Sequence, residues 1–309
     1  MEKNMEHEIA AINQQSFKDK IKSYTKHPGS FLLLLLVLVA AVLTVGVLVF
    51  LVGYILIRGI PYLKPSLFAW TYNSDNVSML PAMINTLFMT VLALLLSVPF
   101  GVGAAIYLVE YAKKGNKLVG IIRVTAETLS GIPSIIFGLF GMIFFGETLG
   151  FGYSLLTGSF TLTLMVLPLI TRNTQEALRT VPDSYRTGAL GMGSTKWHMI
   201  RTILLPSSMP GIVTGIILAL GRIVGESAAL LFTAGSDYKL PKFTGVFGDN
   251  LAKLAHKAME SGGTLTIELY LQMQKGQYDN AFGIGCVLII IVLILNLLTK
   301  LAANKLRRE

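Results

Sequence analysis

The stretch YRTGALGMGSTKWHMIRTILLP, Tyr185–Pro206, is basic and glycine-rich, and it lies between hydrophobic segments long enough to cross a bilayer. Helix-forming residues come first, Gly191 and Gly193 then break them, and a second amphipathic piece ends at Leu205-Pro206. A loop that only connects two membrane helices needs no such construction. The stretch therefore predicts a short helix, a turn and another helix that lie outside the membrane. We call it the docking loop, because it would offer a surface to a partner.

The chain around the docking loop is strongly apolar. Hydrophobic residues make up 53% and charged residues 14% of the 309 residues, and the mean hydropathy is +0.64. A soluble domain carries about 25% charged residues, so the composition predicts an all-α integral membrane protein in contact with lipid. The net charge of +9 is explained by where the basic residues lie, and no nucleic acid partner is expected.

Six windows lack Asp, Glu, Lys and Arg, and each is near or above the roughly 20 residues that span a hydrocarbon core. Because no water satisfies backbone groups there, each window must be helical. The first window is too long for a signal-peptide core, so it is read as a retained membrane helix. The six predicted transmembrane helices are Phe31–Ile57, Val77–Val109, Thr128–Gly146, Thr148–Thr171, Thr202–Gly221 and Asn280–Thr299.

The distribution of Lys and Arg predicts the orientation of these helices. With the N-terminus inside, the inner segments carry eighteen Lys and Arg and the outer segments carry seven, five of them in one long loop. Both termini and the docking loop are therefore expected in the cytoplasm. Residues 1–30 are predicted as a cytoplasmic tail, 31–57 as the first membrane helix and 81–305 as the transmembrane domain.

An external loop is predicted at residues 234–279. Val246–Met259 has a helical period, Thr264–Gln274 forms a second short amphipathic piece, and Gly262-Gly263 separates them. Either this loop faces a partner outside the membrane, or its helices lie on the membrane interface or cap the bundle. The sequence does not distinguish these roles.

The docking loop resembles the coupling loop of type I ABC importer permeases, whose pattern is Glu-Ala-Ala, three residues, Gly, nine residues and Ile-x-Leu-Pro. The glycine and the final tetrapeptide match at the family spacing, whereas the Glu and the first Ala are replaced. The corresponding residues, within a coupling loop at 179–206, are Thr187, Gly188, Ala189, Gly193, Ile203, Leu205 and Pro206. The wider text, VPDSYRTGALGMGSTKWHMIRTILLP followed by GIVTGIILALGRIVGESAALLFTAG, is similar to the phosphate permeases of the PstA family from about Pro81 to Lys305.

The resemblance implies a permease subunit of an ATP-driven phosphate importer in a prokaryotic cell membrane. It implies three kinds of partner: a second, PstC-like permease chain, a dimer of ATP-binding cassette ATPases and an extracytoplasmic phosphate-binding protein. ATP and magnesium would bind the ATPase, and this chain would hold no cofactor. The sequence itself agrees with this division, because it contains neither a phosphate-binding Gly-rich loop nor a zinc motif, and no catalytic or metal site is expected.

Charges at membrane depth predict where an anion would pass. Arg222 and Glu226 are four residues apart in an apolar segment, so on one helix they share a face and can pair. A charge at the bilayer centre costs about 2.5–3.5 kcal/mol on insertion scales, and a guanidinium matches the oxygens of phosphate. Arg222 is therefore a candidate for the translocation path, oriented by Glu226. The alternative is a neutral pair that only fixes helix packing.

Two further candidates, the Arg172–Glu176 pair and Asn85, each have a structural alternative, and for the pair the structural alternative is favoured. Arg172 and Glu176 repeat the four-residue spacing and could belong to the path or form an interfacial ion pair. Asn85 is polar within the second window and could line the path or bond across helices. As for the solute, sulfate and molybdate remain alternatives to phosphate, and an ion-driven carrier, which often shows inverted repeats, is the alternative from another class.

Two local patterns predict how the helices bend and pack. Pro133 follows the small residues Ser130 and Gly131, which predicts a kink or an unwound turn. The pairs Gly211/Gly215 and Gly221/Gly225 give one membrane helix small faces that allow close contact with neighbours.

Overall fold

The computed structural model describes residues 28–70, 72, 77–113, 115–238, 240 and 247–306. Most of the predicted cytoplasmic tail, residues 1–30, lies outside this part of the chain. The chain divides into two compact units at Ile55, and the second unit carries all features discussed below. Every regular element among the described residues is a helix, as predicted.

Five helices are long and apolar enough to cross a membrane, and a bent helix pair can form a sixth span. In the order of the chain, the elements are α3 (Pro28–Gly59), η1 (Ile60–Tyr62), η2 (Pro65–Phe68), α4 (Leu80–Ile106), η3 (Tyr107–Tyr111), α5 (Lys117–Gly131), α6 (Ser134–Gly141), η4 (Met142–Thr148), α7 (Leu155–Thr180), α8 (Asp183–Gly191), α9 (Lys196–Met199), η5 (Ile200–Leu204), α10 (Leu205–Val224), α11 (Ala228–Thr233), α12 (Phe247–Ala258), α13 (Leu265–Gln274) and α14 (Tyr278–Leu306).

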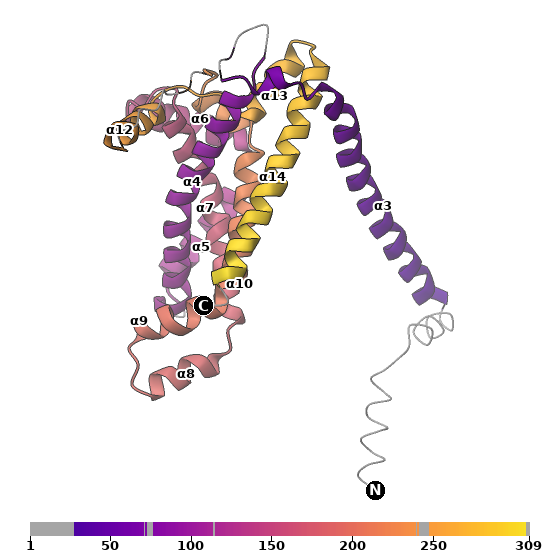
Figure 1. Ribbon diagram of the computed structural model, residues 1–309. Helices are drawn as coiled ribbons and strands as arrows, with labels where there is room; N and C mark the ends of the chain where they lie inside the picture. Colours follow the sequence, from indigo (N-terminus) through magenta and orange to yellow (C-terminus); the bar gives the residue numbers. More distant parts are fainter. Residues whose placement is uncertain are drawn as a thin grey trace. The chain divides into compact units, whose positions relative to one another are not determined.

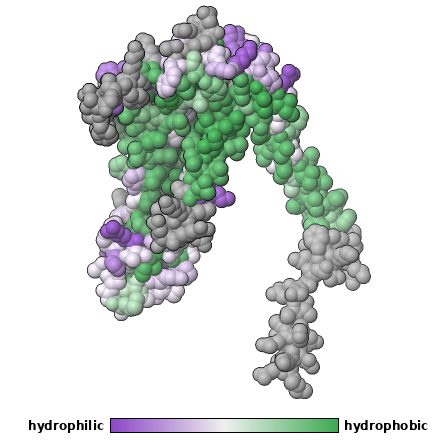
Figure 2. All heavy atoms as spheres, in the orientation of Figure 1, coloured by the Kyte–Doolittle hydropathy of each residue, from purple (hydrophilic) through white to green (hydrophobic). Residues whose placement is uncertain are grey.

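The second unit is a helical bundle with polar elements at its two ends (Figure 1). Helices α8 and α9 lie at one end, and α12 and α13 lie at the other. Hydrophobic side chains cover the middle of the bundle in Figure 2, and hydrophilic ones gather near its ends. This distribution is what a bilayer requires of a spanning bundle.

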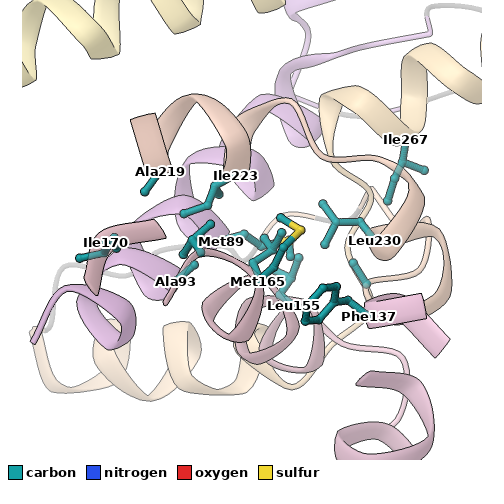
Figure 3. Close-up of a cluster of buried hydrophobic side chains, with 13 residues drawn as sticks. Met89, Ala93, Phe137, Leu155, Met165, Ile170, Ala219, Ile223, Leu230 and Ile267 are labelled. Carbon is teal, nitrogen blue, oxygen red and sulfur yellow. The ribbon is translucent and has the colours of Figure 1, made fainter. Parts of the chain in front are cut away.

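The core of the bundle is built around α4 and α7 (Figure 3). Met89 and Ala93 of α4 pack with Leu162 and Met165 of α7, and helices α6, α10, α11 and α13 add further buried side chains. The α4–α7 contact is close because a Cβ placed on Gly101 would lie 2.8 Å from Ile170 Cγ2. Small residues thus allow the two backbones to approach, as is usual between membrane helices.

Buried hydroxyl groups along this contact bond back to their own helices. Thr90 Oγ1 donates to Thr86 O at 2.7 Å, and Thr163 Oγ1 donates to Ser159 O at 2.8 Å. Since an unsatisfied polar group in the membrane costs several kcal/mol, these local bonds let small polar residues occupy the core. Thr163 Oγ1 also lies 3.4 Å from Ala93 O of α4, so one of these hydroxyl groups has a second acceptor across the helices.

The predicted break at Pro133 is confirmed, but the predicted span around it is wrong. Helix α5 already begins at Lys117, so Arg123 and Glu127 lie within it. After Gly131 the chain turns, and the following helical segment is bent by 104° relative to α5. The charge-free window Thr128–Gly146 therefore joins parts of two helices. Charge-free length located the apolar segment, but the Pro133 ring and the missing amide hydrogen decided where the helix ends.

The next two predicted boundaries also move. Helix α7 begins at Leu155 and ends at Thr180, whereas the predicted window was Thr148–Thr171. The Ser154 side chain accepts a hydrogen bond from the Thr157 backbone amide at 3.1 Å and caps the helix start. At the other end, polar residues up to Thr180 continue the helix beyond the window, because helical backbone bonds do not depend on hydrophobicity.

The two helices predicted in the external loop are confirmed as α12 and α13. Thr264 caps α13 by accepting from the Ile267 amide, and Gly262 and Gly263 lie between the two helices. A Cβ on Gly263 would lie 2.5 Å from the Tyr238 ring, so a glycine is required there. Burial, together with the neighbouring Glu268 carboxylate, raises the pKa of the Tyr238 hydroxyl far above its usual range.

Candidate functional site

The docking loop forms a helix, a tight turn and a second helix, as predicted. Helix α8 ends at Gly191, and Gly193 has φ +82°, a conformation that side chains with a Cβ disfavour. Thr195 then caps α9, since its side chain accepts from the His198 amide. The glycine at the family position therefore makes the turn, and its side of the loop is exposed.

One part of the docking-loop prediction is wrong. The second helix does not end at Leu205-Pro206; α9, η5 and α10 form one continuous helix over Lys196–Val224. The turn Ile200–Leu204 is a π-helix, and such a turn is a common adjustment within a longer helix. Pro206 falls in the first turn of α10, where a missing amide hydrogen costs least. The loop is therefore covalently and helically continuous with a membrane span.

The predicted coupling residues divide between surface and interior. Thr187, Gly188, Gly193 and Pro206 are exposed, Ile203 and Leu205 are half-buried, and Ala189 is buried. Four other residues carry the most exposed apolar side chains of the docking loop, and none of them belongs to the family pattern. They are Tyr185, Leu190, Met192 and Trp197.

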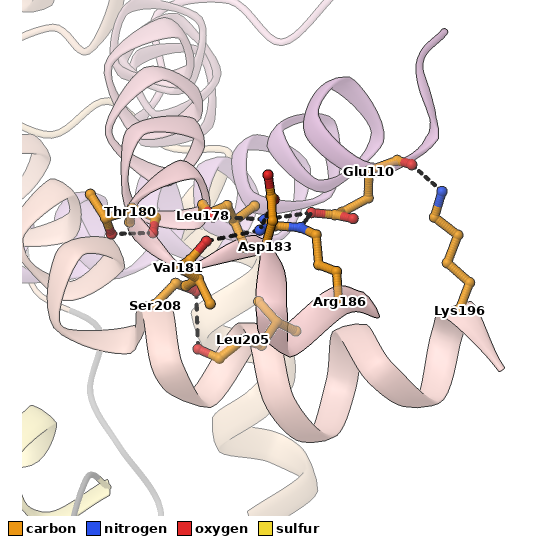
Figure 4. A network of polar contacts seen from close by, with 10 residues as sticks. Glu110, Leu178, Thr180, Val181, Asp183, Arg186, Lys196, Leu205 and Ser208 are labelled. Carbon is orange, nitrogen blue, oxygen red and sulfur yellow. Dashed lines mark hydrogen bonds and ion pairs between the residues drawn. The ribbon is translucent and has the colours of Figure 1, made fainter. Parts of the chain in front are cut away.

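Arg186 binds the docking loop to the rest of the bundle (Figure 4). Its Nε and Nη2 donate to Glu110 Oε1 at 3.0 and 2.9 Å. Its Nη1 donates to Val181 O and Asp183 Oδ1, and its Nη2 also donates to Leu178 O. The side chains of Arg186 and Glu110 are 17% and 5% exposed, so this is a nearly buried ion pair.

A cavity of about 320 Å³ opens between α5, α7 and α10. Four arginines line it, Arg123 from α5, Arg172 and Arg179 from α7 and Arg222 from α10, together with Glu127 and Glu176. Four cations and two carboxylates leave the cavity with an excess of positive charge. We call it the arginine cavity; it is a place where an anion can be held by guanidinium groups from three helices.

The packing of α10 on α7 gives the depth of Arg222. A Cβ on Gly211 would lie 2.5 Å from Ala177 Cβ, and one on Gly215 would lie 2.7 Å from Asn173 Cβ. Further along α10, Arg222 lines the arginine cavity together with Met165, Pro168 and Leu169, which belong to the apolar part of α7.

The predicted pairing of Arg222 with Glu226 is wrong. Helix α10 ends at Val224, so the two residues do not share a helix, and no ion pair joins these two described side chains. Glu226 instead accepts from the Ala229 amide at 3.1 Å at the start of α11, and its carbonyl accepts from Thr266 Oγ1 at 2.7 Å. Gly225 stops the helix, which explains why the four-residue spacing failed.

The structure places the two remaining candidates, the Arg172–Glu176 pair and Asn85, in different parts of the bundle. Arg172 Nε lies 3.2 Å from Glu176 Oε1, so this predicted pair forms, and both residues line the arginine cavity. Asn85 lies elsewhere: it is buried and its Nδ2 donates to Gly263 O at 3.1 Å. Asn85 therefore bonds α4 to the loop before α13, which is the second of the two roles considered for it.

Three arginines of the site were missed in the sequence. Arg123 and Arg179 lie outside the charge-free windows, and Arg186 lies one position before the family pattern. Arg123 and Arg179 were counted as loop charges, but they lie within helices, because α5 and α7 extend beyond the apolar windows. For Arg123 and Arg179, the helical spacing to Glu127 and Glu176 was the available signal.

Comparison with known proteins gives a consistent picture. The family model described as "Binding-protein-dependent transport system inner membrane component" matches residues 97–308. A probable ABC transporter permease protein, YqgI of Bacillus subtilis, is 35% identical over 266 residues, which cover 83% of this chain and 89% of the relative. The phosphate transport system permease protein PstA 1 of Mycobacterium tuberculosis is 33% identical over 219 residues, 70% of this chain and 67% of that protein.

A solved structure supports the fold. A chain of a bacterial ABC transporter involved in the import of the acidic polysaccharide alginate superposes with a TM-score of 0.61 at 17% sequence identity. The superposition covers 92% of this chain and 99% of the other. At this identity the likeness concerns the fold, that of a type I ABC importer permease.

Proposed function

The chain belongs to the family of binding-protein-dependent transport system inner membrane components, and on that premise we propose that it carries inorganic phosphate across the membrane. Members of this family are multi-pass permease subunits, and ATP hydrolysis takes place on a separate subunit. The observation that carries the proposal is the arginine cavity, in which three helices present guanidinium groups to one space.

The charges of the cavity suit an oxyanion. Arg172 is held by Glu176, whereas Arg222 reaches the cavity from α10 without a carboxylate partner among the described residues. A guanidinium that lacks such a partner can donate two parallel hydrogen bonds to phosphate oxygens. Relatives named as phosphate permeases support phosphate over sulfate or molybdate, since the geometry of a tetrahedral oxyanion is common to all three.

The proposed partners follow from the two ends of the bundle. The exposed apolar side chains Tyr185, Leu190, Met192 and Trp197 suit a groove on an ATPase subunit, and the proposed coupling runs through the docking loop. A second, PstC-like permease chain would complete the path. The cap formed by α12 and α13, at the opposite end, would face a phosphate-binding protein.

The test is transport by the complex reconstituted in vesicles with its ATPase and a loaded binding protein. Phosphate should stimulate ATP hydrolysis and accumulate inside, while sulfate and molybdate should do neither. Arg222→Gln should abolish phosphate uptake, and Lys275→Gln, which removes an exposed charge beyond α13, should leave it unchanged. Equal uptake of sulfate would reject phosphate as the specific solute, and full uptake by Arg222→Gln would remove Arg222 from the path.

A further inference from the structure

We propose that Arg186 is a positioning residue that joins the docking loop rigidly to the ends of α4 and α7, so that movement of the loop is transmitted to the arginine cavity. The inference rests on the proposed role as an ATP-driven permease but not on the identity of the solute.

All the N–H donors of the Arg186 guanidinium are used. A guanidinium has five N–H donors in a fixed plane, and Arg186 makes five hydrogen bonds: two to Glu110 Oε1 and one each to Asp183 Oδ1, Leu178 O and Val181 O. Because the donor fork is planar and rigid, the acceptors from three elements are held in one geometry. A lysine could not reproduce it.

Most acceptors of Arg186 lie at or beside the ends of the two core helices. Leu178 and Val181 lie at the end of α7, where the last carbonyls of a helix lack partners within the helix. Glu110 lies in η3, directly after α4. Arg186 itself belongs to α8 of the docking loop. One side chain thus ties the loop to the ends of the two helices that form the core of the bundle.

A second cation, on the second helix of the docking loop, contacts the same segment around Glu110. Lys196, the first residue of α9, donates to the Glu110 carbonyl, and its Nζ lies 4.8 Å from the centre of the Tyr111 ring. Both helices of the docking loop therefore hold the π-helical turn Tyr107–Tyr111. Figure 4 shows Glu110 between Arg186 and Lys196.

We call the contacts of Arg186 and Lys196 with Glu110 the joint. The joint also borders the proposed route of the solute. A second cavity, of about 900 Å³, is lined by Glu110, Asp183 and Arg186 and by Arg123 and Arg179. The last two arginines also line the arginine cavity, so the two spaces share walls. Because these contacts tie α8 and α9 to η3, a displacement of the docking loop moves η3 with it and so changes the wall between the docking loop and the arginine cavity. Coupling of this kind requires a contiguous set of contacts with discrete arrangements.

The experiment measures phosphate transported per ATP hydrolysed in the reconstituted complex. Arg186→Lys and Glu110→Gln break the buried pair, while the control Lys275→Gln removes an exposed charge beyond α13 that takes no part in these contacts. We expect the first two variants to keep stimulated ATP hydrolysis but to lower the ratio by about fivefold or more, the scale of a typical coupling free energy. Lys275→Gln should keep the ratio of the unmodified complex.

Two further readouts keep the test decisive. Where a variant of the buried pair does not assemble with the ATPase, Lys196→Met, at an exposed position, replaces it: a lowered ratio supports the joint and an unchanged ratio rejects it. A ratio unchanged in all assembled variants also rejects it. If the complex transports sulfate rather than phosphate, the phosphate assignment fails, and the same ratio measured with sulfate still tests the joint.

Discussion

Glu176 is a carboxylate that lines the arginine cavity beside the arginines. It pairs with Arg172 at 3.2 Å, yet the two side chains are 62% and 72% exposed. Exposed ion pairs of this kind contribute about 0–1 kcal/mol, because solvent screens them and both side chains lose freedom. The pair is thus a poor source of stability, and under the proposed function Arg172 would exchange Glu176 for a solute anion at little cost.

Glu176→Gln should therefore leave folding unaffected. The thermal unfolding midpoint of the purified complex should stay the same, and phosphate uptake should be kept or increased, because the cavity gains net positive charge. Uptake measured at low and at high salt checks the electrostatic cause, since screening should reduce any gain. Loss of uptake comparable with that of Arg222→Gln would assign Glu176 a direct role in the route.

Among the elements, α10 combines two kinds of small face. Gly211 and Gly215 touch α7, where an added Cβ would meet Ala177 and Asn173 within 2.7 Å. Gly221 has nothing within 4 Å of an added Cβ, and Gly225 meets only the Gly221 carbonyl. The expectation that both glycine pairs serve close packing is thus confirmed for the first pair and wrong for the second, whose Gly225 ends the helix instead.

This difference predicts opposite effects of one substitution on the same helix. Gly211→Ala should destabilise the protein by about 1–3 kcal/mol, as overpacking does, because Ala177 belongs to a helix that cannot yield. Gly221→Ala should be neutral or stabilising by up to about 1 kcal/mol, since alanine favours a helix. Thermal unfolding of the two variants in detergent provides the comparison. Equal midpoints would mean that α10 and α7 separate easily and that their packing does not position Arg222.

At the scale of the whole molecule, the two polar ends of the bundle define its orientation. The docking loop and the cap of α12 and α13 lie at opposite ends (Figure 1), and the excess of Lys and Arg on the docking-loop side predicts that this side is cytoplasmic. The buried Cys286 is the one cysteine of the sequence. It can be replaced to give a background for site-specific labelling.

In a Cys286→Ala background, a membrane-impermeant maleimide added outside intact cells should label Gln274→Cys and not Ser184→Cys. Both positions are exposed and lie at the two ends of the bundle, in α13 and α8. Labelling of Ser184→Cys should appear only after the membrane is permeabilised. The reverse pattern would place the docking loop outside and exclude an ATPase as its partner.

The amino-acid sequence by itself determined the class of the protein, its apolar segments, the helix–turn–helix form of the docking loop and both helices of the cap. These features depend on local chemistry: hydrophobic length sets a span, Gly193 permits the turn and Thr264 caps a helix. The same local information located Arg222 and Arg172 as charges next to apolar sequence.

Only the tertiary structure decided which charges act together. It separated Glu226 from Arg222, assigned Asn85 to a bond with Gly263, and gathered Arg123, Arg172, Arg179 and Arg222 around one cavity. It also joined Arg186 to Glu110, 76 positions away. The physical reason is that the ends of helices depend on single residues such as Gly225 and Pro133, while contacts between helices depend on how distant segments pack. Periodicity along the chain carries neither kind of information.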